Sequence, residues 1–279
     1  MLLYGKHKFE LEKSFLIKKL LNNNRYWNYR LFSDHLSRAD YLVLAKSFIK
    51  REKIIYYSLE STEHSYRYFR PINCSLKISH LGKKSLYFNL LANEYLSGYF
   101  KTLDTVDSKI DETVFISSNY RKISDFFKLK KDKDIKLFGL YATKVPDETN
   151  DYYLNAQMLF SKYKSAICLE NSAQNGYLQG SYIPVLMAKS VPIINTNPNI
   201  LRNILNPKTY ISIDDYLSLN NSRIKSLINE KLEFIRTNSV ESYFTSLFSD
   251  YLKFLGNINT NNMEEAIRIS QIFKKQIFH

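Results

Sequence analysis

Residues 160–177 read FSKYKSAICLENSAQNGY and residues 178–193 read LQGSYIPVLMAKSVPI, and this stretch decides the fold. A short apolar run leads into a polar loop rich in Asn, Ser and Gly, and a helical pattern begins near Ser181, where serine is a favoured helix cap. A second apolar run follows. The pattern predicts a strand–helix–strand unit, whose loop is either an anion-binding loop at a strand's carboxyl end or a purely structural connection.

The same alternation extends over the rest of the chain. Predicted strands are 41–45, 53–58, 113–117, 135–139, 166–168, 191–194 and 209–213. Predicted helices are 9–21, 121–128, 153–163, 182–189, 222–237, 240–254 and 263–277. Strands that alternate with helices are typical of an α/β fold with parallel sheets. Because the alternation breaks in a polar stretch between about residues 100 and 112, the pattern predicts two Rossmann-like domains, 1–104 and 105–255, and a C-terminal helix, 256–279.

Composition excludes several classes of protein. The chain has 279 residues, 44% of them hydrophobic, which is enough for a large core. Its two cysteines cannot form a disulfide framework, and it shows no secretory signal and no apolar run near the ~20 residues of a membrane span. We therefore expect a cytoplasmic protein. With 40 Lys and Arg against 27 Asp and Glu, its net charge of +13 favours nucleic acid, an anionic membrane or a phosphorylated small molecule as partner.

Common catalytic signatures are missing. No P-loop and no G-x-G-x-x-G is present, and the five histidines do not have metal-site spacing. Asp132 and Asp134 have a D-x-D spacing that could hold Mg²⁺ beside a sugar nucleotide, but they sit in a lysine-rich stretch that favours a solvated turn. We therefore expect no metal site.

The quoted stretch resembles the donor-binding motif of glycosyltransferase family 10, the α-1,3/1,4-fucosyltransferases. That motif is a strand ending in F-E-N-S/T, then G-Y-V-T-E-K, a helix and a strand of the form I/V-P-I. Leu169-Glu170-Asn171-Ser172, Gly176-Tyr177 and Val191-Pro192-Ile193 follow the same order and spacing. Thr196-Asn197-Pro198 is similar to the family's next turn, G-[NS]-P, without the glycine.

Upstream segments extend the resemblance to about residues 40–215. Val114–Asn119, followed by Arg121, is similar to the family's F-V-S-S-N strand and its phosphate-binding arginine. Ile135–Gly139 resembles the next strand, V-D-I-Y-G. Lys53–Ser61 is similar to the K-x-x-F-Y-T-G-E-N strand end, whose glutamate is the family's proposed general base, here Glu60.

The resemblance implies a GT-B architecture, with two Rossmann-like domains facing across a cleft, and an inverting, metal-independent transfer of fucose from GDP-fucose. It implies Glu60 as the catalytic base and a donor site made of Ser118, Asn119, Arg121, Glu170, Asn171, Gly176, Tyr177 and Ser181. An inverting transfer needs one carboxylate to take the acceptor proton, and a metal-free site needs arginine or a helix terminus to neutralise the leaving diphosphate. Each of three residues has a purely structural alternative. Glu60 could be a surface carboxylate, Arg121 one more charge on a basic helix, and Tyr177 an aromatic residue that packs in the core.

One position departs from the family pattern. Where the family has Glu-Lys, which hold the ribose and the phosphates, this chain has Gly180-Ser181. Lys122, Lys189 or Arg202 could replace the lost lysine. The chain is therefore either a fucosyltransferase-like enzyme, a transferase that uses another nucleotide sugar, or a weakened relative that binds nucleotide or glycan.

The expected partners are a nucleotide-sugar donor and an oligosaccharide or glycolipid acceptor such as bacterial lipopolysaccharide. Nucleic acid is not expected, because no binding motif is present. The C-terminal helix, Met263–Ile277, is apolar on one side and basic toward its end. It either lies on an anionic inner-membrane surface or packs back on the first domain.

Overall fold

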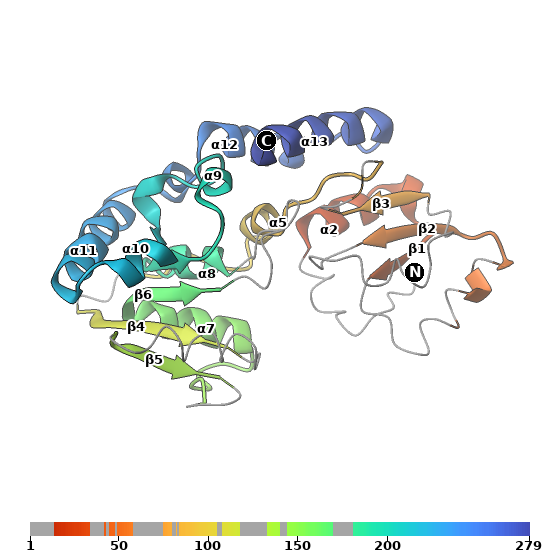
Figure 1. The fold of residues 1–279 in the computed structure, drawn as a ribbon. Helices are drawn as coiled ribbons and strands as arrows, with labels where there is room; N and C mark the ends of the chain where they lie inside the picture. Colours follow the sequence, from red (N-terminus) through yellow and green to blue (C-terminus); the bar gives the residue numbers. More distant parts are fainter. Residues whose placement is uncertain are drawn as a thin grey trace. The chain divides into compact units, whose positions relative to one another are not determined.

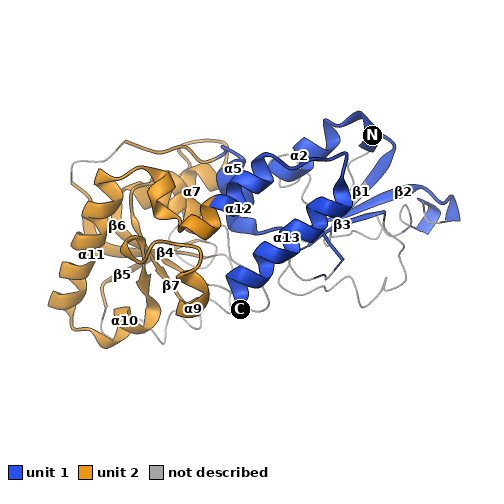
Figure 2. Ribbon diagram, turned by 90° about the horizontal axis from the view of Figure 1, so that it is seen from above, with its two compact units in different colours: residues 1–99, 172–178, 250–279 blue, residues 100–171, 179–249 orange. Residues whose placement is uncertain are grey.

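The computed structural model describes residues 14–33, 42, 45–47, 49–57, 75–79, 82, 84–104, 108–117, 133–139, 144–169 and 181–279. The chain forms two compact units (Figure 2). Unit 1 contains residues 1–99, 172–178 and 250–279, and unit 2 contains residues 100–171 and 179–249. Each unit has a parallel sheet covered by helices, which confirms the predicted α/β class.

Unit 1 is built on a parallel sheet in the order β1-β2-β3. Its strands are β1 (Tyr29–Ser33), β2 (Lys53–Tyr57) and β3 (Leu76–Ile78). Its regular helices are α2 (Phe15–Leu21), α5 (Leu90–Leu96) and α13 (Met263–Phe278), with the short helix η1 (Asn24–Tyr26). The helix α12 (Ser246–Gly256) enters this unit at residue 250. Leu16, Ile55 and Ile78 lie in one buried core with Ile258 and Ala266, so residues 240 positions apart share it.

The C-terminal helix α13 packs on unit 1. Ala266 and Ile277 are buried, and Ser270 Oγ accepts a hydrogen bond from the Tyr87 N–H at 2.9 Å. Gln271 Nε2 donates to two carbonyl oxygens of the segment before Tyr87, at 3.0 and 2.7 Å. The apolar side of α13 is therefore covered by protein, which supports the packing alternative for this helix. No helix in the described part of the chain is long and apolar enough to cross a membrane.

Unit 2 is built on a five-stranded parallel sheet in the order β5-β4-β6-β7-β8, of which Figure 1 labels β4, β5 and β6. The strands are β4 (Ile110–Ile116), β5 (Ile135–Phe138), β6 (Tyr163–Cys168), β7 (Val191–Ile194) and β8 (Ile211–Ser212). The helices are α7 (Tyr152–Ser161), α8 (Tyr182–Met187), α9 (Pro198–Leu201), α10 (Ile213–Ser218) and α11 (Asn221–Thr237), with η3 (Pro207–Thr209) and η4 (Val240–Tyr243). All four residues of β7 are buried, as expected of an inner strand of a sheet covered on both faces.

Some predicted elements differ from the structure. The predicted strand 41–45 is wrong, because Leu42 and Ala45 are helical; five consecutive apolar residues do not distinguish a strand from a helix. The strands β1 and β3 and the helix α5 were not predicted. The predicted helix 240–254 is interrupted, because Phe244 bridges to Leu205 as a short extended segment. The predicted helix 121–128 lies outside the described residues.

A buried lysine joins the beginnings of three strands of unit 2. Lys109, which precedes β4, donates to the carbonyl oxygens of Ser161 and Ala188, at 2.6 and 3.0 Å, and to Ser190 Oγ at 2.9 Å. These acceptors lie in the connections that lead into β6 and β7. Burial, with a smaller effect of the positive charge of Arg236, lowers the pKa of Lys109 to about 7.

We predict that Lys109→Met destabilises the protein by about 2–4 kcal/mol, because the acceptors that Lys109 satisfies would stay buried without a donor. Lys101→Met, at an exposed position of the same unit, should have little effect. Urea unfolding of the two variants measures the difference. A loss below about 1 kcal/mol for Lys109→Met would show that the contacts are not structural.

The pKa of Lys109 adds a pH dependence. Between pH 7 and the ordinary lysine value of 10.5, the unfolded chain binds the proton more strongly than the folded protein, so the contribution of Lys109 to stability rises with pH. The difference in unfolding free energy between the wild type and Lys109→Met should therefore widen from pH 7 to pH 9. A constant difference over that range would mean that the ammonium remains charged inside the fold.

Candidate functional site

The strand order of unit 2 places a ligand-binding crevice at one position. From β4 the chain first adds β5 on one side of the sheet and then β6, β7 and β8 on the other side. In open parallel sheets, ligands bind at the carboxyl ends of the strands where this direction reverses, here between β4 and β6. The pairing of Phe115 with Ile167 brings Ser117 and Leu169, which follow these two strands, to the same level.

Most of the site residues predicted from the sequence come in the segments of chain that follow these two strands. Ser118, Asn119 and Arg121 come after β4, and Glu170, Asn171, Gly176 and Tyr177 come after β6. Glu60 follows β2 of unit 1 by three residues. All eight lie outside the described residues. Their roles therefore stay predictions. The strand topology supports these roles, because the strands after which the residues come end at the carboxyl edge of each sheet.

A glycine brings the ends of β4 and β5 together. Gly139, after β5, has a φ of +124°, which side-chain-bearing residues rarely adopt. A Cβ atom at this position would lie 2.1 Å from the Ser117 carbonyl oxygen, far inside contact distance. The Ser117 N–H donates to the Phe138 carbonyl oxygen at 3.0 Å, so the ladder continues up to this point. The sequence resemblance had singled out Gly139 only as the end of a motif, and the structure shows why a glycine is needed there.

Ser181 is the one predicted site residue that the structure describes. It begins α8, but its side chain makes no capping bond, and its backbone is helical (φ −59°, ψ −15°) instead of extended. The predicted capping role is therefore wrong. Ser181 Oγ is buried and has no hydrogen-bond partner among the described residues. The Ser181 hydroxyl therefore does not cap α8.

Buried contacts fix the start of α8 against the ends of β6 and β7. The Tyr182 hydroxyl and Thr196 Oγ1 lie 2.6 Å apart, and both residues are buried. Cys168, at the end of β6, is buried, and its Sγ lies 3.9 Å from the Ser181 carbonyl oxygen. The backbone that precedes and follows the predicted donor loop is therefore held firmly at the carboxyl edge.

The structure distinguishes among the three residues that could replace the phosphate-binding lysine of the family. Lys189 precedes β7, at the amino edge of the sheet, where it donates to the Ile235 carbonyl oxygen at 3.1 Å and to the Tyr243 hydroxyl at 2.8 Å. Its ammonium group is therefore hydrogen-bonded at the edge opposite to the crevice. Arg202 is exposed at the end of α9, which follows the carboxyl end of β7, and remains a candidate. Lys122 lies outside the described residues.

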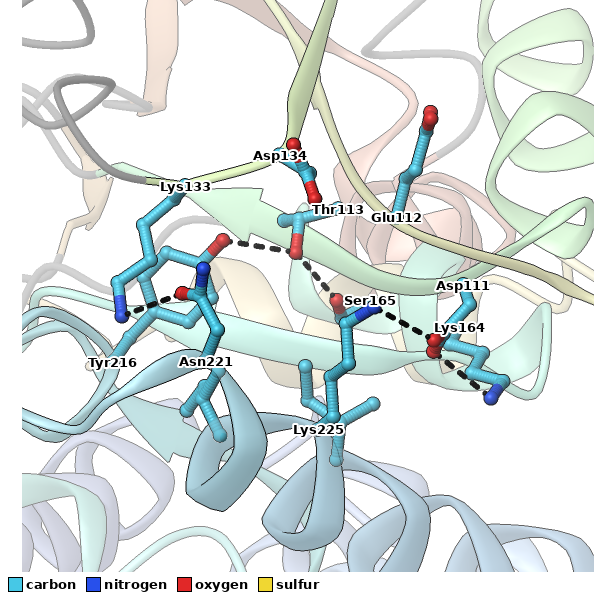
Figure 3. Close-up of a pocket in the computed structure, with 12 residues that line it drawn as sticks. Asp111, Glu112, Thr113, Lys133, Asp134, Lys164, Ser165, Tyr216, Asn221 and Lys225 are labelled. Carbon is cyan, nitrogen blue, oxygen red and sulfur yellow. Dashed lines mark hydrogen bonds and ion pairs between the residues drawn. The ribbon is translucent and has the colours of Figure 1, made fainter.

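A second hollow lies at the amino edge of the same sheet, beside α10 and α11 (Figure 3). Asp111 pairs there with Lys164 at 2.9 Å and Lys225 at 3.1 Å, and the hydrogen bond from Lys164 is the main cause that lowers the pKa of Asp111. Thr113 Oγ1 lies 2.9 Å from Ser165 Oγ and accepts a hydrogen bond from the Tyr216 hydroxyl at 3.1 Å.

The contacts in this hollow are structural. Its carboxylate Asp111 is already paired with two lysines, and Lys133 donates to the Leu219 carbonyl oxygen at 2.5 Å. Asp134 of the D-x-D pair lines the hollow at the beginning of β5, whereas Asp132 lies outside the described residues. Within the described ranges, no three His, Cys, Asp or Glu side chains are grouped to hold a metal ion.

Comparisons with known proteins agree with this geometry. Residues 107–245 match the family model for glycosyltransferase family 10 (fucosyltransferase), C-terminal part. The chain is similar to three solved structures of alpha1,3-fucosyltransferase: without a named ligand (16% identity, TM-score 0.53), with GDP-fucose (14%, 0.52) and with GDP (14%, 0.51). Each match covers 98% of this chain and 87% of the other. No curated protein is significantly similar in sequence. The likeness confirms the predicted GT-B type of fold.

We predict that Gly139→Ala lowers the unfolding free energy by roughly 2–4 kcal/mol, because the new methyl group overlaps the Ser117 carbonyl oxygen and the backbone is strained. Gly256→Ala is the matched control, since a Cβ atom there meets nothing within 4 Å. Urea unfolding should show the control to be unchanged or slightly stabilised. Equal stability of the two variants would mean that the ends of β4 and β5 can separate freely.

Proposed function

Because this chain belongs to glycosyltransferase family 10, we propose that it transfers fucose, or a related sugar, from GDP-fucose to a hydroxyl group of a bacterial surface glycan. The transfer inverts the anomeric carbon and needs no metal. The observation that carries this proposal is the coincidence of two independent findings: the family match spans unit 2, and unit 2 has its topological switch point where the predicted donor residues follow β4 and β6.

Glu60 is the proposed catalytic base. It takes the proton of the acceptor hydroxyl while the acceptor oxygen forms a bond to the anomeric carbon of the donor. The bond from that carbon to the diphosphate breaks at the same time, and GDP leaves with the electron pair. The central position of β2 in the sheet of unit 1 supports this role, since Glu60 follows the carboxyl end of that strand.

The proposed donor site neutralises the leaving diphosphate without a metal. Arg121 supplies the guanidinium group, which binds phosphate oxygens with two donors. Ser118 and Asn119 precede it as polar donors, and Asn171 and Tyr177 lie against the nucleotide. Glu170, Gly176 and Ser181 complete the site by their positions in the motif.

The departure at Gly180-Ser181 favours a second candidate function. A chain that lacks the family's ribose-binding glutamate and phosphate-binding lysine could use another nucleotide sugar, or act as a weakened relative that binds nucleotide or glycan without turnover. The Ser181 hydroxyl, which has no hydrogen-bond partner within the described ranges, supports a changed donor contact, because a serine can donate a hydrogen bond to phosphate but supplies no charge.

We place the reaction in the cytoplasm, with peripheral contact to the inner membrane. Acceptors of this enzyme family in bacteria include lipid-linked or lipopolysaccharide oligosaccharides, as the resemblance implies. An enzyme that works on them benefits from binding the membrane that carries them.

The donor is tested by the melting temperature in the presence of millimolar GDP, GDP-fucose, UDP or CMP, with and without EDTA. GDP and GDP-fucose should raise the melting temperature, and EDTA should not reduce the effect, because ligands that bind only the folded state stabilise it. A shift in melting temperature with UDP or CMP alone would mean that the donor is a sugar linked to that nucleotide instead of GDP-fucose. If no nucleotide shifted the melting temperature, the proposed donor site would be refuted.

Glu60→Gln should reduce turnover at least 100-fold and leave the shift with GDP unchanged, because it removes the base but not the donor contacts. Glu63→Gln, three residues away, serves as the control and should retain turnover. Release of GDP from GDP-fucose in the presence of acceptor oligosaccharide measures both. Full turnover of Glu60→Gln would remove Glu60 from the mechanism.

Restoring the family pair with Gly180→Glu and Ser181→Lys decides between the two candidate functions. If the wild type is a weakened family member, the double variant should bind GDP-fucose about tenfold more tightly or more, since one charged hydrogen bond to phosphate is regained. Gly180→Ala with Ser181→Ala controls for the loss of the hydroxyl. Weaker binding by the restored variant would instead indicate a donor site built around Ser181.

A further inference from the structure

The positive charge of the chain is concentrated in one unit. Unit 1 holds 21 Lys and Arg against 11 Asp and Glu, which leaves ten of the thirteen excess charges there, whereas unit 2 has only three. Unit 2 is the unit with the family match and the proposed diphosphate site. The part of the chain with the family match therefore accounts for little of the excess charge.

Unit 1 also carries the three most exposed large apolar residues of the described chain. The side chains of Ile49, Leu42 and Trp27 are 79%, 67% and 61% exposed. Single exposed apolar residues are ordinary on protein surfaces, but these three come from two neighbouring segments. The indole N–H of Trp27 donates to the Leu21 carbonyl oxygen at 3.1 Å, which fixes the ring at the surface.

Trp27 and the end of the helical stretch before β2 lie at the same edge of the sheet. Tyr29 at the beginning of β1 pairs with Lys53 at the beginning of β2, so Trp27 and Arg51, each two residues earlier, both lie at the amino edge. The helical stretch that includes Leu42 and Ile49 leads directly into β2, and Figure 1 draws its end in orange next to the beginning of that strand.

The helical stretch before β2 exposes an apolar face flanked by cations. Leu42, Ala45, Lys46 and Ile49 are three or four residues apart, hence on one side of a helix, and all are exposed, whereas Ser47 on the other side is buried. Lys50 and Arg51 follow and are exposed as well. The acidic Glu52 is paired with Arg30, so it does not offset these charges.

At the end of this helical stretch, Arg51 occupies the position at which glycine is usual. The Glu52 N–H donates to the Ser47 carbonyl oxygen at 3.0 Å, and Arg51 has a φ of +54°, which together form the common helix-ending motif with a left-handed residue. Glycine adopts this conformation without strain, whereas arginine costs about 1 kcal/mol. Among the described residues, the Arg51 side chain makes no hydrogen bond or ion pair that would offset the strain, which fits a residue needed for its surface charge.

We infer that this amino-edge patch, made of Trp27, Leu42, Lys46, Ile49, Lys50 and Arg51, binds the surface of an anionic lipid membrane. Exposed aliphatic and indole side chains enter the boundary between headgroups and acyl chains, while lysine and arginine attract the anionic headgroups. Each cation near such a surface contributes about 1 kcal/mol.

The position of the patch fits an enzyme that acts on membrane-attached glycans. Trp27 and Arg51 of the patch lie at the amino edge of the unit 1 sheet, and the carboxyl end of β2 is the length of a five-residue strand away, or roughly 16 Å. Membrane binding through the patch therefore leaves the carboxyl edge of this sheet free. The inference is independent of the donor: it concerns a second surface and does not require that the chain transfers fucose.

The test is co-sedimentation of the full chain with vesicles of phosphatidylcholine, with and without phosphatidylglycerol. The wild type should bind the vesicles that contain phosphatidylglycerol, and high salt should weaken this binding. Lys46→Glu with Lys50→Glu should reduce it about 30-fold or more, which corresponds to the loss of two headgroup attractions. Trp27→Ser with Ile49→Ser should reduce binding also at high salt.

The control variant is Ile272→Ser with Lys275→Glu on α13, which removes an exposed apolar residue and an exposed cation from the same unit. It should bind vesicles as the wild type does. Loss of binding in this control but not in the patch variants would transfer the membrane contact to α13 and overturn the inference. Equal binding to both kinds of vesicle, or binding of an RNA oligonucleotide but of no vesicle, would overturn it as well.

Vesicle binding and donor binding are measured separately, so the two proposals can fail separately. Patch variants should keep the shift in melting temperature with GDP. A chain that binds vesicles but no nucleotide would retain the membrane patch and lose the transferase proposal. A chain that binds GDP but no vesicle would keep the transferase proposal and lose the membrane patch.

Discussion

The parallel pairing of β4 with β6 is the constraint on which unit 2 depends. These strands are far apart in the sequence, since Thr113 pairs with Ser165, and the pairing sets the strand order that creates the switch point. A one-residue slip of β6 against β4 would turn Ser165 to the other face of the sheet and break its buried hydrogen bond with Thr113, which also accepts from Tyr216. The polar chain between the three hydroxyls therefore specifies the register, although each of its bonds contributes little net energy.

The two edges of this sheet have different tasks. At the amino edge, Lys109 joins the connections that lead into β6 and β7, and Asp111 joins β4 to Lys164 of β6 and Lys225 of α11. Side-chain bonds there hold the strands in place. At the carboxyl edge, Gly139 and the buried pair of Tyr182 and Thr196 hold the backbone, and the polar residues of the proposed site follow in the chain. Side-chain hydrogen bonds and ion pairs are concentrated at the amino edge, so the polar residues that follow the carboxyl edge can be chosen for chemistry.

The sequence predicted the sheet of unit 2 well, because its strands are short apolar runs bounded by polar turns. The sheet of unit 1 was predicted poorly. β1 reads YRLFS and contains both polar and apolar residues without alternation, and Leu42 and Ala45 of the apolar run at 41–45 are helical. The donor site was located by motif alone, and Ser181 shows the limit of that method: serine before a helical pattern indicates a cap, yet the helical backbone at Ser181 leaves its hydroxyl without that bond. The roles of Lys109 and Gly139 depend on segments distant in sequence, which no local pattern shows.

The surplus charge illustrates how composition and site chemistry can differ. A net charge of +13 in a chain that resembles a metal-free diphosphate-using enzyme suggests a strongly cationic donor site. Unit 2 is nearly neutral, however, and its buried or half-buried lysines Lys109 and Lys189 bind carbonyl oxygens at the amino edge. Ten of the thirteen excess charges belong to unit 1. They can act on an extended anionic surface, where many weak attractions add up, and the exposed apolar side chains beside them favour a membrane over a soluble polyanion.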